Sequence, residues 1–453
     1  MALPRVVVAP PPTSPTSPAS PASPTVSGAG PPEQAPAPGV PAVVRRNTLL
    51  LATSQAIVGA GTQMVPSLGA LMVLQLGGPP ALAGLASGLL GVSRFLVAYP
   101  IGRLTDRRGR VPGILAGQAV SLLGALLLGL SVVAGSLPLL VLGLLVFGLG
   151  IGAGQQLRLA AADMYLPARR AEGLGYVMTG SLLGVFGGPL LIAAAEQTGA
   201  RTGLPVVAIA WWLVPLLVVP SMLLVARVRP DPREIGADLA RYYPGYMPPA
   251  PPAVPVAAPA GVWAWLRYGP TRAAFGATAA AQGAMALMMA MTPLSLAHHG
   301  HSLSAISFSV ALHVVGMFGF SLPLGHLADR AGRRPTMLAG TAVCAAGSVL
   351  VPLSESYWVA TLGIFLVGVG WSAATVAATA QIADVVPPES RGRAVGAGDT
   401  LAGVAAIVCP LLAGLAVQGY GLGALAPLSL LLLAPAALLL LRQPGSLRAD
   451  VIR

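Results

Sequence analysis

A nine-residue segment occurs twice in this chain, each time between two long apolar runs. Residues 102–110 read Gly-Arg-Leu-Thr-Asp-Arg-Arg-Gly-Arg, and residues 325–333, at an offset of 223, read Gly-His-Leu-Ala-Asp-Arg-Ala-Gly-Arg. A second set repeats at an offset of 221, and it pairs Asp163 with Asp384, Pro167 with Pro388, Arg170 with Arg391, Gly175 with Gly396 and Pro189 with Pro410. Two sets of residues in nearly constant register indicate an internal duplication, so the fold must consist of two similar halves.

The apolar runs that flank these segments are long enough to cross a membrane. Only 9% of the residues are charged and 55% are apolar, whereas about a quarter of a soluble domain is charged. A spanning helix needs about 20 apolar residues, and twelve such runs occur, six on each side of one polar stretch. We expect spans at 48–72, 81–101, 111–133, 137–160, 172–195, 204–226, 271–297, 303–324, 335–353, 356–382, 392–417 and 421–441. Glycine and proline inside them are compatible with membrane helices. The sequence therefore predicts an all-α membrane protein.

The net charge of +12 arises from 26 basic residues, all of them arginine. They gather before the first span, in alternate loops and in the tail, at Arg45, Arg46, Arg107, Arg110, Arg169, Arg170, Arg229, Arg233, Arg330, Arg334, Arg391, Arg393, Arg442 and Arg448. This distribution argues against a nucleic-acid partner and follows the positive-inside rule. We expect a multi-pass protein of the cell (inner) membrane with both termini cytoplasmic.

The segments outside the expected spans divide the chain into five parts. These are a disordered Pro/Ser/Ala-rich cytoplasmic N-terminus (1–44), a first six-helix half (45–227), a cytoplasmic central loop (228–270), a second half (271–442) and a cytoplasmic tail (443–453). Residues 1–44 lack the apolar core of a signal peptide and have a composition typical of disorder. The central loop is rich in proline, carries Tyr242, Tyr243 and Tyr246, and is expected to tether the halves without a catalytic role.

No metal, cofactor or nucleotide site is expected. Cys344 and Cys409 lie inside spans without a second ligand nearby, so a CxxC or zinc pattern is excluded and small core residues are expected. A Walker-type loop is impossible without lysine. The sequence thus argues against ATP hydrolysis by this chain, so either an ion gradient supplies the energy or the protein is a uniporter.

The repeated segment identifies a resemblance to the major facilitator superfamily over roughly residues 45–442. Residues 102–110 match the pattern G-x-L-x-D-R-x-G-R of that superfamily, and residues 325–333 repeat it. The resemblance implies twelve transmembrane helices in two pseudo-symmetric six-helix bundles, and a membrane transporter that acts as a monomer on a small-molecule substrate. It does not identify the substrate. The sequence departs from proton-coupled drug exporters at Leu144, where they carry an arginine, and only approximates the glycine and proline pattern of antiporters.

Charged residues at the cytoplasmic ends of the spans form one candidate cluster in each half. Glycines permit a tight turn in the repeated loop, and the carboxylate of Asp106 can lie at the positive end of a neighbouring helix, which the resemblance implies is the eleventh. Arg110 and Arg333 are within reach of Asp163 and Asp384. The clusters are expected to latch the cytoplasmic side closed, or else only to fix the topology of the loops. The candidate gating residues are Gly102, Asp106, Arg107, Gly109, Arg110, Asp163, Arg170, Gly325, Asp329, Arg330, Gly332, Arg333, Asp384 and Arg391.

Two opposite charges lie inside predicted spans. Arg94 precedes Gly102 by eight residues in the second span, and Asp399 follows Arg391 by eight in the eleventh, so both lie about 12 Å from the cytoplasmic helix ends. The repeat-related positions are the neutral Met317 and Met178. Charges in mid-membrane cost about 2.5–3.5 kcal/mol on insertion scales and suggest function.

The resemblance places the second and eleventh helices opposite each other between the halves. One hypothesis is therefore that Arg94 pairs with Asp399 when the cytoplasmic side is closed, and that protonation of Asp399 favours inward opening, which makes protons the coupling ion. Two alternatives remain open. The pair could be static, or Arg94 could bind an anionic substrate while Asp399 faces a water-filled cavity.

Other polar residues lie on helices that line the central path in the superfamily. These candidate cavity residues are Gln55, Gln63, Gln155, Gln156, Arg158, Gln282, His313 and Trp371. Each glutamine could instead form an interhelical hydrogen bond, His313 could be a packing residue, and Arg158 could belong to the cytoplasmic charge cluster near Asp163.

Two functions of different class follow from these observations. The first is a proton-coupled secondary transporter of a small organic solute, a symporter or antiporter that works by alternating access. Export and uptake are equal alternatives. The second is a non-transporting membrane protein of the same fold that serves biogenesis or sensing. Charges retained in both loops and in mid-membrane favour the first, and neither function is that of an enzyme.

Overall fold

The computed structural model describes residues 39–443 except 155, 248–261, 354 and 387, so the tract 1–38 and the tail from 444 lie outside it. All secondary structure in the described residues is helical. Eleven helices are long and apolar enough to cross a membrane, or twelve if the pair Leu303–Gly319 and Ser321–Ala331, bent by 41°, counts as one span. The all-α expectation is therefore confirmed.

Several expected spans of the first half consist of two helical pieces. The elements are α1 (Ala42–Thr62), α2 (Met64–Gln75), η1 (Pro80–Leu82), α3 (Leu85–Arg108), α4 (Arg110–Val133), α5 (Leu137–Gly154), α6 (Gln156–Asp163), η2 (Pro167–Arg169), α7 (Arg170–Gly184), α8 (Gly187–Thr202), α9 (Val206–Leu213) and α10 (Pro215–Ala226). In the fourth span α5 and α6 are separated only by residue 155, which lies outside the described residues. The sixth span breaks at Pro215, which begins α10 and cannot donate the hydrogen bond that would continue α9.

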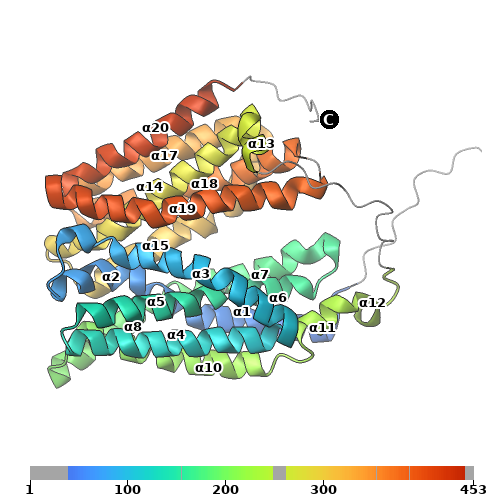
Figure 1. Cartoon of the computed structure of the whole chain (residues 1–453), viewed down its shortest axis with the longest axis horizontal. Coiled ribbons are helices and arrows are strands. Elements are labelled where there is room, and N and C mark those ends of the chain that lie inside the picture. Colours follow the sequence, from blue (N-terminus) through green and yellow to red (C-terminus); the bar gives the residue numbers. More distant parts are fainter. Residues whose placement is uncertain (1–38, 155, 248–261, 354, 387, 444–453) are drawn as a thin grey trace, which may run out of the picture. The chain divides into compact units, whose positions relative to one another are not determined.

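The second half has longer helices. It comprises α14 (Gly269–His298), α15 (Leu303–Gly319), α16 (Ser321–Ala331), α17 (Arg333–Leu353), α18 (Tyr357–Val385), α19 (Pro388–Tyr420), η3 (Leu422–Ala424) and α20 (Leu425–Leu441). Its helices lie beside those of the first half, as Figure 1 shows, and the two groups meet mainly through α3 with α19, α8 with α15 and α2 with α14. Leucines such as Leu183, Leu190 and Leu431 remain exposed, as expected for side chains that face lipid.

The first helix begins earlier than the sequence predicted. Residues 42–44, which the sequence assigned to a disordered segment, form the first turn of α1, and Val44 is fully buried. The reason is an apolar cluster in which Val44 joins Ile235, Leu239 and Tyr243 of the central loop. A partner outside the membrane spans thus stabilises the start of the helix.

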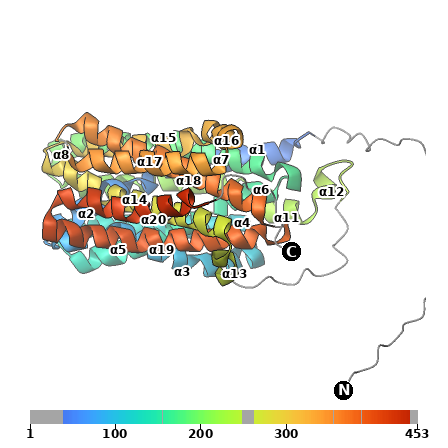
Figure 2. The same ribbon diagram turned by 90° about the horizontal axis from the view of Figure 1, so that it is seen from above.

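Part of the central loop is folded against the first half. Two short helices, α11 (Pro232–Ala237) and α12 (Leu239–Tyr242), lie at the end of the bundle where α6 ends (Figures 1 and 2). The hydroxyl of Tyr243 donates to the carbonyl oxygen of Met164 at 3.0 Å, and burial raises the pKa of Tyr243 to about 12, so the donor proton is retained. A third helix, α13 (Val262–Arg267), packs on α14 and α19.

Candidate functional site

A cavity of about 460 Å³ lies between the two halves. Its wall is formed by Gly91, Arg94 and Phe95 of α3, Gln282 of α14, and Asp399, Thr400, Ala402, Gly403, Val404, Ala406 and Ile407 of α19. A volume of this size suits a small organic ligand. The structure thus brings together Arg94, Asp399 and Gln282, three of the residues that the sequence singled out.

Arg94 and Asp399 face the same cavity but do not touch. Both side chains are exposed, although both lie within helices of the membrane bundle, because the cavity admits solvent to them. Among the ion pairs of the described residues, none joins Arg94 to Asp399. Their pairing in a closed state stays a prediction.

Beyond the cavity, α3 and α19 pack backbone against backbone. A Cβ atom on Gly84 would lie 1.7 Å from the carbonyl oxygen of Pro410, and one on Gly414 would lie 2.3 Å from that of Ala81. A Cβ on Gly91 would meet the side chain of Ile407 at 2.6 Å. Small residues allow such close approach between membrane helices, so glycine closes this side of the cavity.

Two hydrogen bonds between the halves lie on the same side. The backbone N–H of Ser304 in α15 donates to the Glu196 carboxylate of α8 at 3.2 Å, and Ser67 donates to Ser307 at 3.5 Å. We call this side the closed end, and we call the side that carries the repeated segments 102–110 and 325–333 the loop-motif end.

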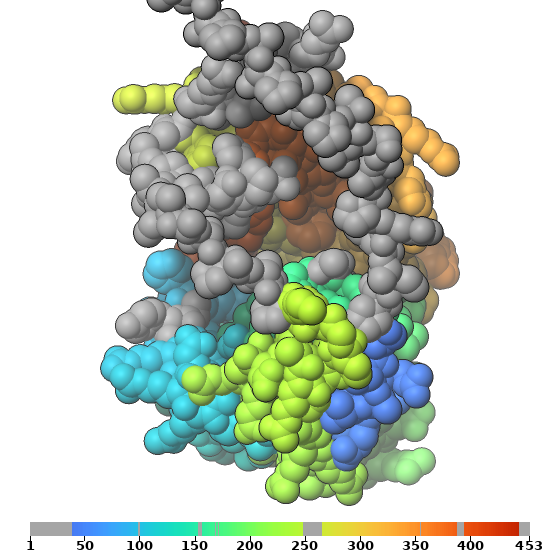
Figure 3. Space-filling view, turned by 90° about the vertical axis from the view of Figure 1, so that its right-hand side faces the viewer, coloured from blue at the N-terminus to red at the C-terminus, as the bar shows by residue number. Residues whose placement is uncertain are grey.

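At the loop-motif end, every ion pair found in the described part of the chain stays within one half. Figure 3 views the molecule from this end and shows the orange and red second half set back behind the blue, cyan and green first half. On this side of the cavity, Cβ atoms on Gly102 and Gly396 would meet nothing within 4 Å. The structure is therefore closed at one end and open at the loop-motif end.

Each repeated loop carries a charge cluster, as the sequence predicted. Arg110 bonds to Asp163 at 2.7 Å and to Gln156 at 3.2 Å, with Asp106 at 3.8 Å. In the second half Arg333 bonds to Asp384 at 3.0 Å and also to Asp329. Asp106 is largely exposed, and the side chains of residues 388–393, where the eleventh span begins, lie outside the described residues.

Only one glycine of each repeated loop makes the turn. Gly109 and Gly332 have φ angles of +100° and +98°, a region that favours glycine. Gly102 and Gly325 lie inside α3 and α16, so the expectation that they also form the turn is wrong. Arg107, Arg170 and Arg330 are exposed, and the side chain of Arg391 lies outside the described residues.

The central loop adds a residue that the sequence interpretation missed. The carboxylate of Asp231 accepts from the backbone N–H groups of Arg110 and Val111 at the start of α4, each at 2.9 Å. It also caps α11 by accepting from the N–H of Arg233 at 2.9 Å. Negative charge is favourable at helix N-termini, so one aspartate joins the central loop to the first repeated segment. Its position five residues after the sixth span was the available signal.

The other predicted cavity residues lie in different environments. The indole N–H of Trp371 donates to Oε1 of Gln282 at 2.8 Å, which places both beside the cavity. His313 does not line it, because its ring is fully buried and its Nδ1 bonds to the carbonyl of Ile364 at 2.6 Å. Gln156 is buried in the Arg110 cluster, Gln63 separates α1 from α2, and Gln155 lies outside the described residues.

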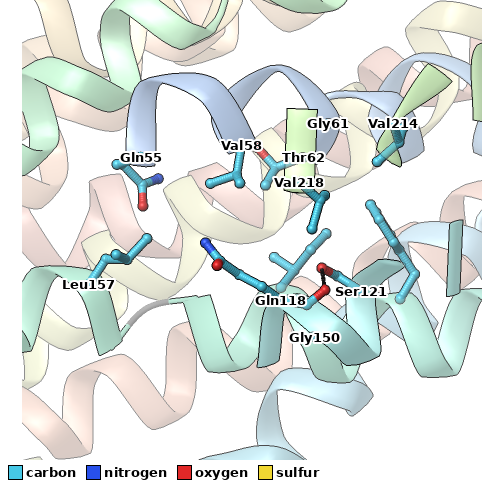
Figure 4. A pocket seen from close by; sticks show the side chains of 12 residues that line it. Gln55, Val58, Gly61, Thr62, Gln118, Ser121, Gly150, Leu157, Val214 and Val218 are labelled. Carbon is cyan, nitrogen blue, oxygen red and sulfur yellow. Dashed lines mark hydrogen bonds between the residues drawn. The ribbon is translucent and has the colours of Figure 1, made fainter. Parts of the chain in front are cut away.

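A second, smaller cavity of about 50 Å³ lies within the first half. Figure 4 shows Gln55, Thr62, Gln118 and Ser121 around it. Nε2 of Gln118 donates to Ser221 at 2.7 Å, and Ser221 lies 2.6 Å from Ser54, while Oε1 of Gln118 has no partner among the described atoms. The sequence interpretation missed this polar cluster, whose signal was a glutamine within the third span.

Comparison with known proteins agrees with this architecture. The family model of the Major Facilitator Superfamily matches residues 51–267 and 273–451. The chain belongs to the major facilitator superfamily. This superfamily member is a multi-pass membrane transporter and not an enzyme.

Relatives of similar length share this assignment. The MFS-type transporter YdeG of Bacillus subtilis is 29% identical over 83% of this chain and 86% of its own. The riboflavin transporter RfnT of Brucella anthropi is 27% identical over 78% of this chain and 85% of its own. Among solved structures, an inward-facing, unoccupied bacterial homologue of the human lysosomal transporter Spinster has a TM-score of 0.64 at 16% identity, with 89% of this chain and 96% of that one covered. That likeness concerns the fold.

Proposed function

We propose that this protein is a proton-coupled secondary transporter that moves a small organic solute across the cytoplasmic membrane by alternating access. The observation that carries the proposal is the cavity between the halves, open at one end, with Arg94 and Asp399 facing each other from α3 and α19. The excess of arginine at the loop-motif end supports a cytoplasmic location for that end. The relative RfnT is named a riboflavin transporter, and riboflavin is a small organic solute.

In this mechanism the two charges act as a latch. When the loop-motif end closes, α3 and α19 approach, and the guanidinium of Arg94 meets the carboxylate of Asp399. A proton on Asp399 removes one charge and releases the latch. Breaking a buried pair costs about 3–5 kcal/mol, which is enough to reverse a two-state equilibrium of moderate bias.

Replacing the carboxylate tests the proton coupling. We expect Asp399→Asn to abolish coupled transport, so that cells with the wild-type protein and cells with the variant differ in untargeted mass spectra of cell contents and medium. A solute enriched in the medium only with the wild type identifies export, and one enriched in the cells identifies uptake. Glu355→Gln, which alters an exposed acid in the loop between α17 and α18, is the matched control at equal expression.

Two results would count against parts of this proposal. Identical profiles for wild type and Asp399→Asn, both distinct from empty vector, would retain transport and remove Asp399 from the coupling. Profiles that all equal the empty vector would favour the non-transporting alternative.

Reversal of both charges tests the latch without relying on transport. The reporter is Val404→Cys in the cavity wall, with the buried Cys344 and Cys409 replaced by alanine. We expect Arg94→Asp or Asp399→Arg alone to favour the open state by about a hundredfold or more, from the cost of an unpaired charge. A membrane-impermeant maleimide added on the cytoplasmic side should then react faster. The double reversal should restore the wild-type rate, and additive effects of the two changes would contradict the latch.

A further inference from the structure

Arg94 in the cavity wall and Arg158 on the neighbouring span have no acidic partner among the ion pairs of the described residues. The backbone and stem of Arg94 pack on Gly152 of α5, where an added Cβ would lie 3.3 Å from Cα and 3.6 Å from Cγ of Arg94. Arg158 follows six residues later in the same span, on α6, within electrostatic range of Arg94. In the part of the chain that the structure describes, the ion pairs use Arg110, Arg169 and Arg333 and leave these two arginines unpaired.

Two guanidinium groups in this position favour a counter-charge. Arginine stays protonated, so the two side chains repel each other, and the repulsion grows as water is excluded. Among the residues that line the cavity, Asp399 is the one carboxylate. Arg94 and Asp399 balance each other in the wall. Arg158 lies outside the lining but adds a second positive charge within electrostatic range of Arg94, so the region around Arg94 carries an excess of positive charge.

Gln282 presents a further donor to the cavity. An indole N–H can only donate, so its hydrogen bond from Trp371 fixes Oε1 of Gln282 as the acceptor. The amide nitrogen then remains as the free group, because no described residue accepts from it. A guanidinium from α3 and an amide N–H₂ from α14 thus offer donors, which suits the oxygen atoms of a carboxylate or phosphate.

The rest of the wall is apolar. Phe95, Val404 and Ile407 contribute the larger side chains, and Gly91 and Gly403 leave room beside them. The cavity therefore combines a small region of donors with a wall that packs against carbon. A simple inorganic anion would bind the hydrogen-bond donors but would make no use of the apolar wall.

We propose that the transported solute is an organic anion, whose carboxylate or phosphate group binds Arg94, with Arg158 adding positive charge nearby and Gln282 donating a further hydrogen bond. This inference rests on the proposed function, since it identifies the substrate class of the same cavity. It also gives Arg94 two alternative partners. The substrate holds its guanidinium in the open state, and Asp399 holds it when the cavity is empty and the loop-motif end closes.

Binding to the purified full-length protein tests this inference. The probes are benzoate and phenyl phosphate as anions, and benzamide and benzyl alcohol as neutral molecules of similar shape, with thermal stabilisation in detergent as the readout. We expect at least one anion to raise the melting temperature in a saturable manner while the neutral molecules have no effect. Preference for benzoate or for phenyl phosphate distinguishes a carboxylate from a phosphate substrate.

Variants connect this binding to the two arginines. Arg94→Gln and Arg158→Gln should each weaken anion binding by about tenfold or more, as expected for a lost charge-assisted hydrogen bond. Arg94→Lys should retain part of the affinity, because it keeps the charge without the planar fork. Arg201→Gln, at an exposed position of α8, changes the net charge equally and should bind anions like the wild type.

Failure of the inference differs from failure of the proposed function. Equal stabilisation by benzoate and benzamide, no stabilisation by either anion, or undiminished anion binding to both glutamine variants would overturn the anion site. Discovery of a transported neutral or cationic solute in the metabolite profiles would do the same while transport stands. Arginine-dependent anion binding in a protein that transports nothing would support the site and contradict the transporter.

Discussion

Substitution of Gly84 by alanine is expected to open the closed end and reduce transport at least about tenfold. The added methyl group would overlap the carbonyl oxygen of Pro410 at 1.7 Å, far inside the contact distance, and a backbone atom cannot rotate away. The first turn of α3 must then move away from the part of α19 around Pro410. Because helices in a membrane associate through close packing, the closed end loses its tightest contact.

The Val404→Cys reporter measures this change directly. In the Gly84→Ala background we expect an impermeant maleimide added on the side of the closed end to label the cavity faster than it labels the wild type. Gly414→Ala should act alike, since its Cβ would lie 2.3 Å from the carbonyl oxygen of Ala81. Gly419→Ala, on the same helix with open space around its Cβ, is the matched control. Normal transport and labelling in Gly84→Ala, with a wild-type elution profile, would refute a role for this contact in closure.

The two charge clusters at the loop-motif end should differ sharply in their contribution to stability. Arg110→Ala removes the partner of Asp163, whose side chain is only 31% exposed, and leaves Gln156 and Thr105 without their donor. We expect a loss of about 3–5 kcal/mol for this partly buried network. Arg333→Ala acts on Asp384 and Asp329, which are 54% and 62% exposed, and should cost about 0–1 kcal/mol.

Thermal unfolding and proteolysis of the purified protein in detergent compare the two variants. Arg170→Ala, at the exposed first residue of α7, serves as the control for loss of one charge. Equal shifts in melting temperature for Arg110→Ala and Arg333→Ala would show that the two clusters contribute equally to stability despite their different burial.

The span pattern could be predicted because hydrocarbon imposes a simple length requirement on apolar runs. The helices α4 (Arg110–Val133) and α17 (Arg333–Leu353) begin within two residues of the expected spans. The repeat also placed Arg110 and Arg333 beside their aspartates. These features depend on local sequence and on duplication, both of which are visible in one chain.

The direction in which polar side chains point could not be predicted in the same way. In a soluble helix, an apolar stripe identifies the buried face. Lipid and protein interior are both apolar, so α18 carries no such signal for Trp371. His313 and Gln156 were therefore assigned to the cavity, although the first bonds to a backbone carbonyl and the second to Arg110. The closed end depends on Gly84 meeting Pro410 across more than three hundred residues, which no local pattern encodes.

The bonds made by Asp231 affect how the molecule could be divided. Because this aspartate caps α4, and Tyr243 is anchored to Met164, the segment after the sixth span is built into the first half rather than suspended between the two. A separately expressed first half would have to extend to Met247 to keep its own caps and its apolar cover over Val44. Co-expression of fragments cut at residue 228 would leave the start of α4 uncapped, whereas a cut beyond Met247 would separate the chain without removing a single one of these bonds.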